Sequence, residues 1–336
     1  MISTRTHRSR LAASAVALTG ALALAGCGSL GESADDASGD GGIESLNIIV
    51  PADPGGGWDL TGRKMQGVMQ DNDLVGNAQV ENVTGAGGTT GLAQLANETD
   101  ENTLMVMGLV MLGAVETNQS EATLEDVTPI AELTEEPLII VAPADSPYED
   151  VNDLVEDQAE RGQGVSIAGG SAGGADHILA GLMLQNAGVE PESLNYIPYS
   201  GGGESLAALL GGKVDAGISG VAEYASQVEN GKLKALGVSG EERSELMPDV
   251  PTLTEQGVDV TLTNWRGVVA PGNIDDAKAD QLVELVTDMH DTEDWATVLE
   301  ENAWADAFVP GEEFGTFIEE ETVRVQQVLR DIGLVE

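Results

Sequence analysis

The segment SLNIIV (residues 45–50), followed by PADPGGGWD (residues 51–59), decides the fold class of this chain. A short aliphatic run predicts a strand, and the Pro- and Gly-rich turn behind it predicts a connection into a helix. The same succession recurs towards the C-terminus, which favours βα units, a mostly parallel sheet and an α/β fold. Strands are expected at residues 45–50, 78–83, 103–110, 138–142, 164–168, 195–198, 214–218 and 260–269. Helices are expected to end near residues 69, 97, 161, 187, 210, 290 and 331.

Five of the predicted strand-to-helix junctions are rich in glycine: residues 51–59, 84–91, 169–174, 199–203 and 219–220. Each junction aims unpaired backbone N–H groups and the positive end of a helix at the space beyond the strand. Anions bind readily in such a space. For any single junction, a tight turn is the favoured explanation. Because ligands of open α/β sheets lie outside the carboxyl ends of the strands, the five junctions together predict one anion-binding cleft.

The charge of the chain is extreme. Its 336 residues include 58 Asp and Glu against 14 Lys and Arg, a formal net charge of -44. Nucleic acids and anionic membrane surfaces attract basic proteins, so no nucleic acid is expected as a partner. A hydrophobic fraction of 41% argues for a folded chain and against intrinsic disorder. We interpret the acid excess as an adaptation to high salt, which predicts faster capture of an anion as salt screens the surface.

The N-terminus has the organisation of an export signal. Residues 1–10 carry three Arg and no acid, and residues 11–26 are almost wholly apolar or small, too short a run for a transmembrane helix. The run ends at Cys27, the one Cys of the chain. The sequence LAGC resembles the lipobox at which bacterial lipoproteins are cleaved and lipidated, although a chance Cys in a secretory signal is the alternative. We therefore expect a signal peptide at residues 1–26 and a flexible tether at residues 27–42.

Enzyme motifs are few. GGSAG at residues 169–173 matches G-x-S-x-G around Ser171, in the strand-to-helix context of a hydrolase nucleophile. A triad also needs a His, and only His177 and His290 follow the signal, so a secreted serine hydrolase is kept as the alternative. Residues 85–91 fail the dinucleotide pattern because Thr90 stands at the third glycine position. With no second Cys, no His cluster and no Ca²⁺ loop, we expect no metal, no cofactor and no catalytic residue.

Several motifs in fixed order resemble those of one receptor family. They are PADPGGGWDLTGR (51–63), VENVTGAGGTTG (80–91), GGSAGGADH (169–177), PYSGGGESLAALLGGKVD (198–215), GKLKALG (231–237), VPTLTEQG (250–257) and WRGVVAP (265–271). From about residue 46 to the C-terminus, the chain resembles the extracytoplasmic receptors of tripartite tricarboxylate transporters, the TctC or Bug family.

The resemblance implies a two-lobed type II periplasmic-binding-protein fold. Lobe 1 would comprise residues 43–143 and 264–336, and lobe 2 residues 144–263, with the chain crossing near residues 142–146 and 261–265. The lobes would close on a small carboxylic acid, a tri- or dicarboxylate such as citrate, and the closed monomer would deliver it to the membrane subunits of the transporter. A sensor that presents the ligand to a membrane kinase is the other use of such a receptor.

The resemblance also implies the residues that hold the carboxylate. In the family, main-chain amides and ordered waters do so, here from Pro54, Gly55, Gly56, Gly57, Trp58 and Asp59 and from Gly170, Ser171, Ala172, Gly173 and Gly174, with His177 close by. The glycine-rich junctions add Gly87, Ser200, Gly201 and Ser219 to the predicted ligand-binding residues. Arg266 is the expected cationic side chain, ahead of Arg63, for which an i,i+4 ion pair with Asp59 is an equal alternative. Trp58 departs from the smaller residue usual in the family.

Overall fold

The computed structural model of the chain describes residues 42–335, which lie in one compact unit with its own core. The predicted signal peptide, the predicted lipidation at Cys27 and the tether up to residue 41 lie outside the described residues. Within residues 42–335, no helix combines the length and the apolar character that a bilayer crossing requires.

The first sheet joins the two ends of the described chain. Its strands are β1 (Ile43–Val50), β2 (Val75–Asn82), β3 (Thr103–Gly108), the first part of β4 (Val127–Pro143), β9 (Thr263–Pro271) and β10 (Ala305–Pro310). They run in the order β2-β1-β3-β9-β4, with β10 also paired to β4. The helices of this part are α1 (Gly57–Asp71), α2 (Thr89–Leu95), α3 (Leu109–Thr117), α8 (Asp276–His290), α9 (Glu293–Asn302) and α10 (Gly311–Asp331).

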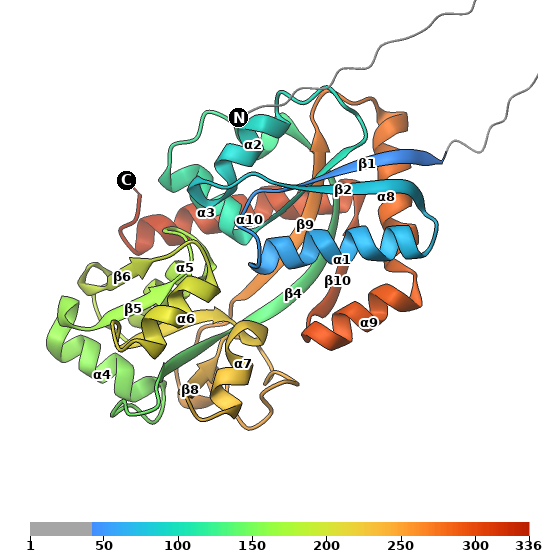
Figure 1. The fold of residues 1–336 in the computed structure, drawn as a ribbon. Coiled ribbons are helices and arrows are strands. Elements are labelled where there is room, and N and C mark those ends of the chain that lie inside the picture. The colour runs from blue at the N-terminus through green and yellow to red at the C-terminus, as the bar shows by residue number, and fades with distance from the viewer. Residues whose placement is uncertain (1–41, 336) are drawn as a thin grey trace, which may run out of the picture. The chain divides into compact units, whose positions relative to one another are not determined.

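The second sheet is formed by the middle of the chain. It contains the last part of β4, β5 (Ser166–Gly169), β6 (Asn195–Pro198), β7 (Ala216–Gly220) and β8 (Leu233–Val238), in the order β4-β7-β5-β6 with β8 paired to β4. Its helices are α4 (Val151–Arg161), α5 (Ala175–Asn186), α6 (Gly202–Leu210) and α7 (Val221–Glu229). Figure 1 shows these green and yellow elements gathered around one end of β4, away from α8 and α9.

Strand β4 belongs to both sheets. Its first part pairs with β9 up to Pro137, and from Leu138 it pairs with β7. The sequence predicted only residues 138–142 as a strand, because prolines and acidic residues interrupt the apolar pattern before them. The change of sheet therefore falls a few residues before the expected crossing at 142–146. The lobe limits, residues 43–143 with 264–336 and residues 144–263, stay a prediction.

The expectation of a mostly parallel sheet is wrong. Among the described strands, β1–β2, β1–β3, β5–β6 and β5–β7 are parallel, whereas every pair that includes β4 or β9 is antiparallel. The reason is that β4 and β9 carry the chain between the two sheets, so they run against the βα units on either side. The α/β class and the two-lobed fold are confirmed.

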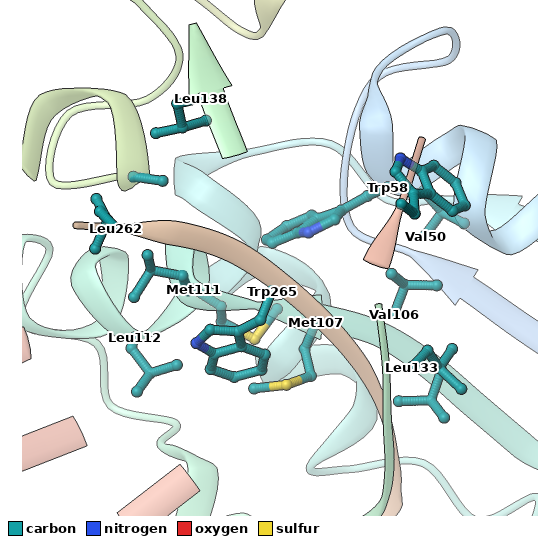
Figure 2. Close-up of a cluster of buried hydrophobic side chains, with 14 of the residues drawn as sticks. Val50, Trp58, Val106, Met107, Met111, Leu112, Leu133, Leu138, Leu262 and Trp265 are labelled. Atoms are coloured by element: carbon teal, nitrogen blue, oxygen red, sulfur yellow. The ribbon is translucent and has the colours of Figure 1, made fainter. Parts of the chain in front are cut away.

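The core of the first sheet is mainly aliphatic, with Trp265 at its centre. The Trp265 ring is 1% exposed and meets Phe314 and Phe317 edge to face, with ring centroids 6.0 and 5.1 Å apart. Figure 2 shows Trp265 beside Met107 and Leu112, which come from β3 and α3. Edge-to-face aromatic packing adds to the burial energy of such a cluster. Trp265 thus holds β9, and with it the neighbouring Arg266, in a fixed position.

Candidate functional site

All five glycine-rich junctions meet in one cleft of about 890 Å³. The first sheet contributes the loops after β1 and β2, and the second sheet contributes the loops after β5, β6 and β7. The wall consists of residues 51–58, 84–88, 170–172, 198–204 and 219–220, with Val110, Asn118, Asp176, Glu223, Asn264 and Arg266. The predicted convergence of the five junctions is therefore present in the fold.

Most of the predicted ligand-binding residues line this cleft. Pro54, Gly55, Gly56, Gly57, Trp58, Gly87, Gly170, Ser171, Ala172, Ser200, Gly201, Ser219 and Arg266 do so, whereas Asp59, Gly173, Gly174 and His177 do not. Contact of the lining residues with a ligand stays a prediction. The four remaining residues include two whose side chains hold cleft loops in place, Asp59 and His177.

Helix α1 points its first turn at the cleft. Gly56 is its N-cap in extended conformation, and no side chain caps the helix. Among the described residues, no acceptor bonds the amides of Gly57 and Trp58. Gly55, at φ 94°, makes the left-handed turn that L side chains resist. These two free amides and the positive helix end make this the best-prepared anion position of the cleft.

The Asp59 side chain holds the loop between β1 and α1 in place without lining the cleft. Its carboxylate accepts hydrogen bonds from the amide of Gly55 at 2.9 Å, from Asn82 at 2.8 Å and from Arg63 at 3.0 Å. Burial raises the pKa of Asp59, but the hydrogen bonds from Arg63 and Asn82 outweigh it and hold the pKa below its usual value. Arg63 therefore makes the i,i+4 ion pair and does not line the cleft.

Arg266 is the one Lys or Arg among the cleft-lining residues. Its side chain forms an ion pair with Glu136 of β4, and its guanidinium carbon lies 5.2 Å from the ring centroid of Trp304. Trp304 Nε1 donates to the second Glu136 oxygen at 3.1 Å. A methyl group on Gly57 would lie 2.6 Å from Arg266 Nη2, so the guanidinium lies against the start of α1. The sequence analysis missed the positioning residues Glu136 and Trp304.

The Arg266 guanidinium keeps unused donors. Arg266 is 2% exposed, and its Nε and Nη1 atoms have no hydrogen-bond partner in the part of the chain that the structure describes. A buried donor without an acceptor is costly.

The second sheet brings carboxylates to the cleft that the sequence analysis also missed. Helices α5, α6 and α7 each begin at a Gly without a side-chain cap and carry an acid in the first turn, Asp176, Glu204 and Glu223 respectively. Asp176 accepts from the amide of Gly170 at 2.6 Å, and Glu223 accepts from Ser219 Oγ at 2.9 Å. Burial raises the pKa of Asp176 to about 7 and also raises that of Glu223.

Ser171 and His177 do not form a hydrolase pair. His177 Nδ1 accepts a hydrogen bond from the amide of Gly173 at 3.2 Å, and the ring stacks on Tyr196 with centroids 4.0 Å apart. Burial lowers the pKa of His177 to about 4, which keeps the ring neutral. Over residues 42–335 there is no hydrogen bond between Ser171 and His177. His177 acts as a support for the loop that follows β5.

Metal ligands are not grouped in this fold. Within the described residues, no three His, Cys, Asp or Glu side chains lie close enough together to hold a metal ion. The acids of the cleft are Asp53 in the loop after β1 and three acids at the starts of separate helices, Asp176, Glu204 and Glu223.

Comparison with known proteins identifies the family. The family model described as the tripartite tricarboxylate transporter family receptor, TctC, matches residues 63–334. The BugT protein of Bordetella pertussis is 29% identical over 240 residues, which cover 68% of this chain and 71% of BugT.

Solved structures of periplasmic binding proteins share the fold. MatC from Rhodopseudomonas palustris with bound malate is 25% identical, with a TM-score of 0.74 over 85% of this chain and 98% of MatC. The periplasmic binding protein BugD is 25% identical, with a TM-score of 0.76 over 87% of this chain and 98% of BugD. The resemblance seen in the motifs is confirmed, and the chain belongs to the TctC family of solute-binding receptors, which are not enzymes.

Proposed function

We propose that this receptor captures a small carboxylic acid in the cleft and delivers it to the membrane subunits of a tripartite tricarboxylate-type transporter. The observation that carries the proposal is the meeting of the free Gly57 and Trp58 amides with the guanidinium of Arg266, which lies against the start of α1. Backbone amides at a helix start and a guanidinium fork both favour carboxylates. Di- and tricarboxylates, citrate included, are the first candidates, and the malate-bound relative supports a dicarboxylate.

Capture would proceed by closure of one lobe on the other. The cleft is lined from both sheets, and strand β4, which belongs to both, passes between them close to Glu136. A carboxylate held by α1 and Arg266 would be covered when the loops after β5, β6 and β7 approach. Closure would remove water and strengthen each charge-assisted hydrogen bond. The closed form would then be the one that the transporter recognises.

The proposed location is the outer face of the cytoplasmic membrane, with the monomer anchored by a lipid on Cys27. The basic and apolar residues 1–26 and the LAGC sequence support it. Cell fractionation tests the anchor. The wild-type chain is expected in the membrane fraction, and a Cys27→Ala variant is expected to leave it. A Cys27→Ala variant that stays membrane-bound and lipid-labelled would contradict the proposal.

Thermal unfolding of residues 42–336 with candidate ligands tests the binding function. Citrate, malate and succinate are compared with the uncharged diamides of malate and succinate, which keep the carbon skeleton without the carboxylates. A true ligand at a hundred times its dissociation constant stabilises the folded state by about 2.7 kcal/mol, which gives a clear rise in melting temperature. The diamides are expected to give no rise. If no carboxylate raises the melting temperature, the proposed function is wrong.

A further inference from the structure

The chain passes between the two sheets at two places that lie at the same level. Strand β4 pairs with β9 up to Pro137, whose partner is Thr263, and from Leu138 it pairs with β7. The chain returns to the first sheet at Thr263, directly after Leu262. We call residues 137–138 the first crossing and residues 262–263 the second crossing. If one lobe moves against the other, both crossings must bend.

Ser239 lies between the two crossings and binds both. Its amide donates to the Leu138 carbonyl at 2.9 Å, and its hydroxyl accepts from the Leu138 amide at 2.9 Å. The hydroxyl also donates to the Leu262 carbonyl at 2.5 Å, and the Ser239 carbonyl accepts from the Leu262 amide at 3.0 Å. One residue therefore makes four hydrogen bonds, two to each crossing.

The surroundings of Ser239 are closed to water. Ser239 and Leu138 are 0% exposed, and Leu262 is 2% exposed. Figure 2 shows the two leucines at the same side of the buried hydrophobic cluster to which both belong. Breaking the four bonds would leave buried peptide groups without a partner, which is costly. Leu138, Ser239 and Leu262 therefore move as one piece.

Ser239 fastens this piece to the second sheet. It follows directly on β8, whose Val238 pairs with Ile139 of β4. Bending is thereby confined to one peptide link in each crossing, on the side of the first sheet. The first crossing directly follows Glu136, which is ion-paired with Arg266 of the cleft. A bend at the crossings therefore acts close to the cation of the cleft.

We propose that Ser239 is a positioning residue for closure, because it joins the two crossings so that they bend together about one axis. Ser239 does not line the cleft and acts through the crossings alone. With the crossings joined, the lobes approach each other in one direction. Without the hydroxyl, each crossing can bend separately, so the lobes can also twist. This inference rests on the closing motion of the proposed function and assigns the residue that guides it.

The test measures the distance between the lobes. The one Cys of the chain is Cys27, so residues 42–336 can receive two spin labels through Ala159→Cys on α4 and Ala296→Cys on α9, both at exposed positions. Pulsed electron paramagnetic resonance gives the distribution of distances between the labels. Ser239→Ala removes the hydroxyl and keeps the backbone bonds of this residue. It is expected to broaden the distribution in the ligand-free protein.

Ligand binding supplies the second readout. With malate as the probe, Ser239→Ala should weaken binding about threefold to tenfold, because a smaller fraction of the free protein is aligned for closure. Ser166→Ala is the matched control. The Ser166 hydroxyl also donates and accepts, to the Asp215 carboxylate at 2.7 Å and from the Asp215 amide at 3.1 Å. It stands at the start of β5, outside the cleft, and its variant should keep the wild-type distances and malate affinity.

The outcomes separate guidance of closure from a merely structural role. Both variants are expected to lower the urea midpoint, because each loses a hydroxyl that donates and accepts. A Ser239→Ala variant that loses stability but keeps the wild-type distances in the free protein overturns the inference. Equal broadening in Ser166→Ala also overturns it. Because the decisive distances are those of the free protein, the inference can fail while carboxylates bind and can hold while none binds.

Should Ser239→Ala not fold, hydrogen exchange of the wild type decides. The amides of Leu138, Ser239 and Leu262 all donate within the same group of bonds. If the crossings open together, the three amides are protected from exchange to the same degree. A Leu262 amide that is far less protected than the Leu138 amide would mean that the crossings open separately, and would overturn the inference.

Discussion

Glu132 offers the sharpest test of the fold's energetics, because it is a buried acid of the first sheet that forms no ion pair with any residue in the range 42–335. The residue lies on β4 and is 2% exposed, and its Oε1 atom has no hydrogen-bond partner within the described residues. Burial, and then the charges of Glu135 and Glu321, raises the pKa of Glu132 from 4.5 to about 8. Replacing it with Gln removes the titration and keeps the size of the side chain.

The sign and size of the effect follow from this pKa. The folded state holds the proton of Glu132 more tightly than the unfolded state does. The contribution of protonated Glu132 to the free energy of unfolding is therefore full below pH 4.5 and is lost as pH rises through about 8. At about 1.4 kcal/mol per pH unit, the wild type is expected to lose at most about 4 kcal/mol relative to Glu132→Gln between pH 5 and pH 8.5.

Urea unfolding of both proteins at a series of pH values measures this difference. The quantity to follow is the difference in unfolding free energy between wild type and variant. Its change with pH reports Glu132 alone, because the titration of every other group cancels in the difference. Glu320→Gln, on the exposed face of α10, is the matched control. Its difference in unfolding free energy from wild type should not vary with pH. A Glu132→Gln difference that changes by less than about 1 kcal/mol over this range would refute the reasoning.

Three further changes test the cleft and the packing. Gly57→Ala places a methyl group 2.6 Å from Arg266 Nη2 and should weaken carboxylate binding about tenfold. Gly56→Ala, whose methyl group meets no atom closer than 3.8 Å, should leave binding unchanged. Titration calorimetry on both variants measures the difference. Burial lowers the pKa of His177 to about 4, so the wild type should lose stability as pH falls from about 6.5 towards 4. Urea unfolding at pH 7 and 4.5 should show this loss in the wild type and not in His177→Phe. Gly315→Ala inside α10 meets only a proline side chain at 3.5 Å and should raise stability by up to about 1 kcal/mol, read from the urea midpoint.

The sequence predicts those parts of the fold in which local pattern and tertiary role agree. The strand at residues 195–198 and the end of the helix at residue 290 match the structure, because an apolar run or a 3.6-residue period extends to a clear stop. The strand expected at residues 103–110 ends at Gly108, and α3 follows at once. Strand β3 is buried throughout and most of the first five residues of α3 are buried, so the apolar residues show no period that distinguishes strand from helix.

The sequence likewise indicates some residues of the candidate site and not others. The glycine-rich junctions are visible in the sequence because glycine permits the tight turns and the close approach of a ligand to the backbone, and all five reach the cleft. Glu136 and Trp304 are invisible in the sequence, because only the pairing of β4 with β9 and the chain turn before β10 bring them to Arg266. Asp176 and Glu223 had a readable signal, an acid in the first helical turn after each glycine-rich loop. An acid in the first turn is equally common in helices that border no cleft, so this signal does not by itself identify Asp176 and Glu223 as cleft-lining residues.

The late strand β9 has a consequence for how the chain is made. It is inserted between β3 and β4, so that Met105 pairs with Val269 and Thr128 with Ala270, and the first sheet stays incomplete until nearly all of the chain is available. Contacts between such distant residues form slowly. A nascent chain that cannot close its first sheet remains threadable through a narrow pore for longer. The order of strands thus delays completion of the first sheet until β9 and β10 are available.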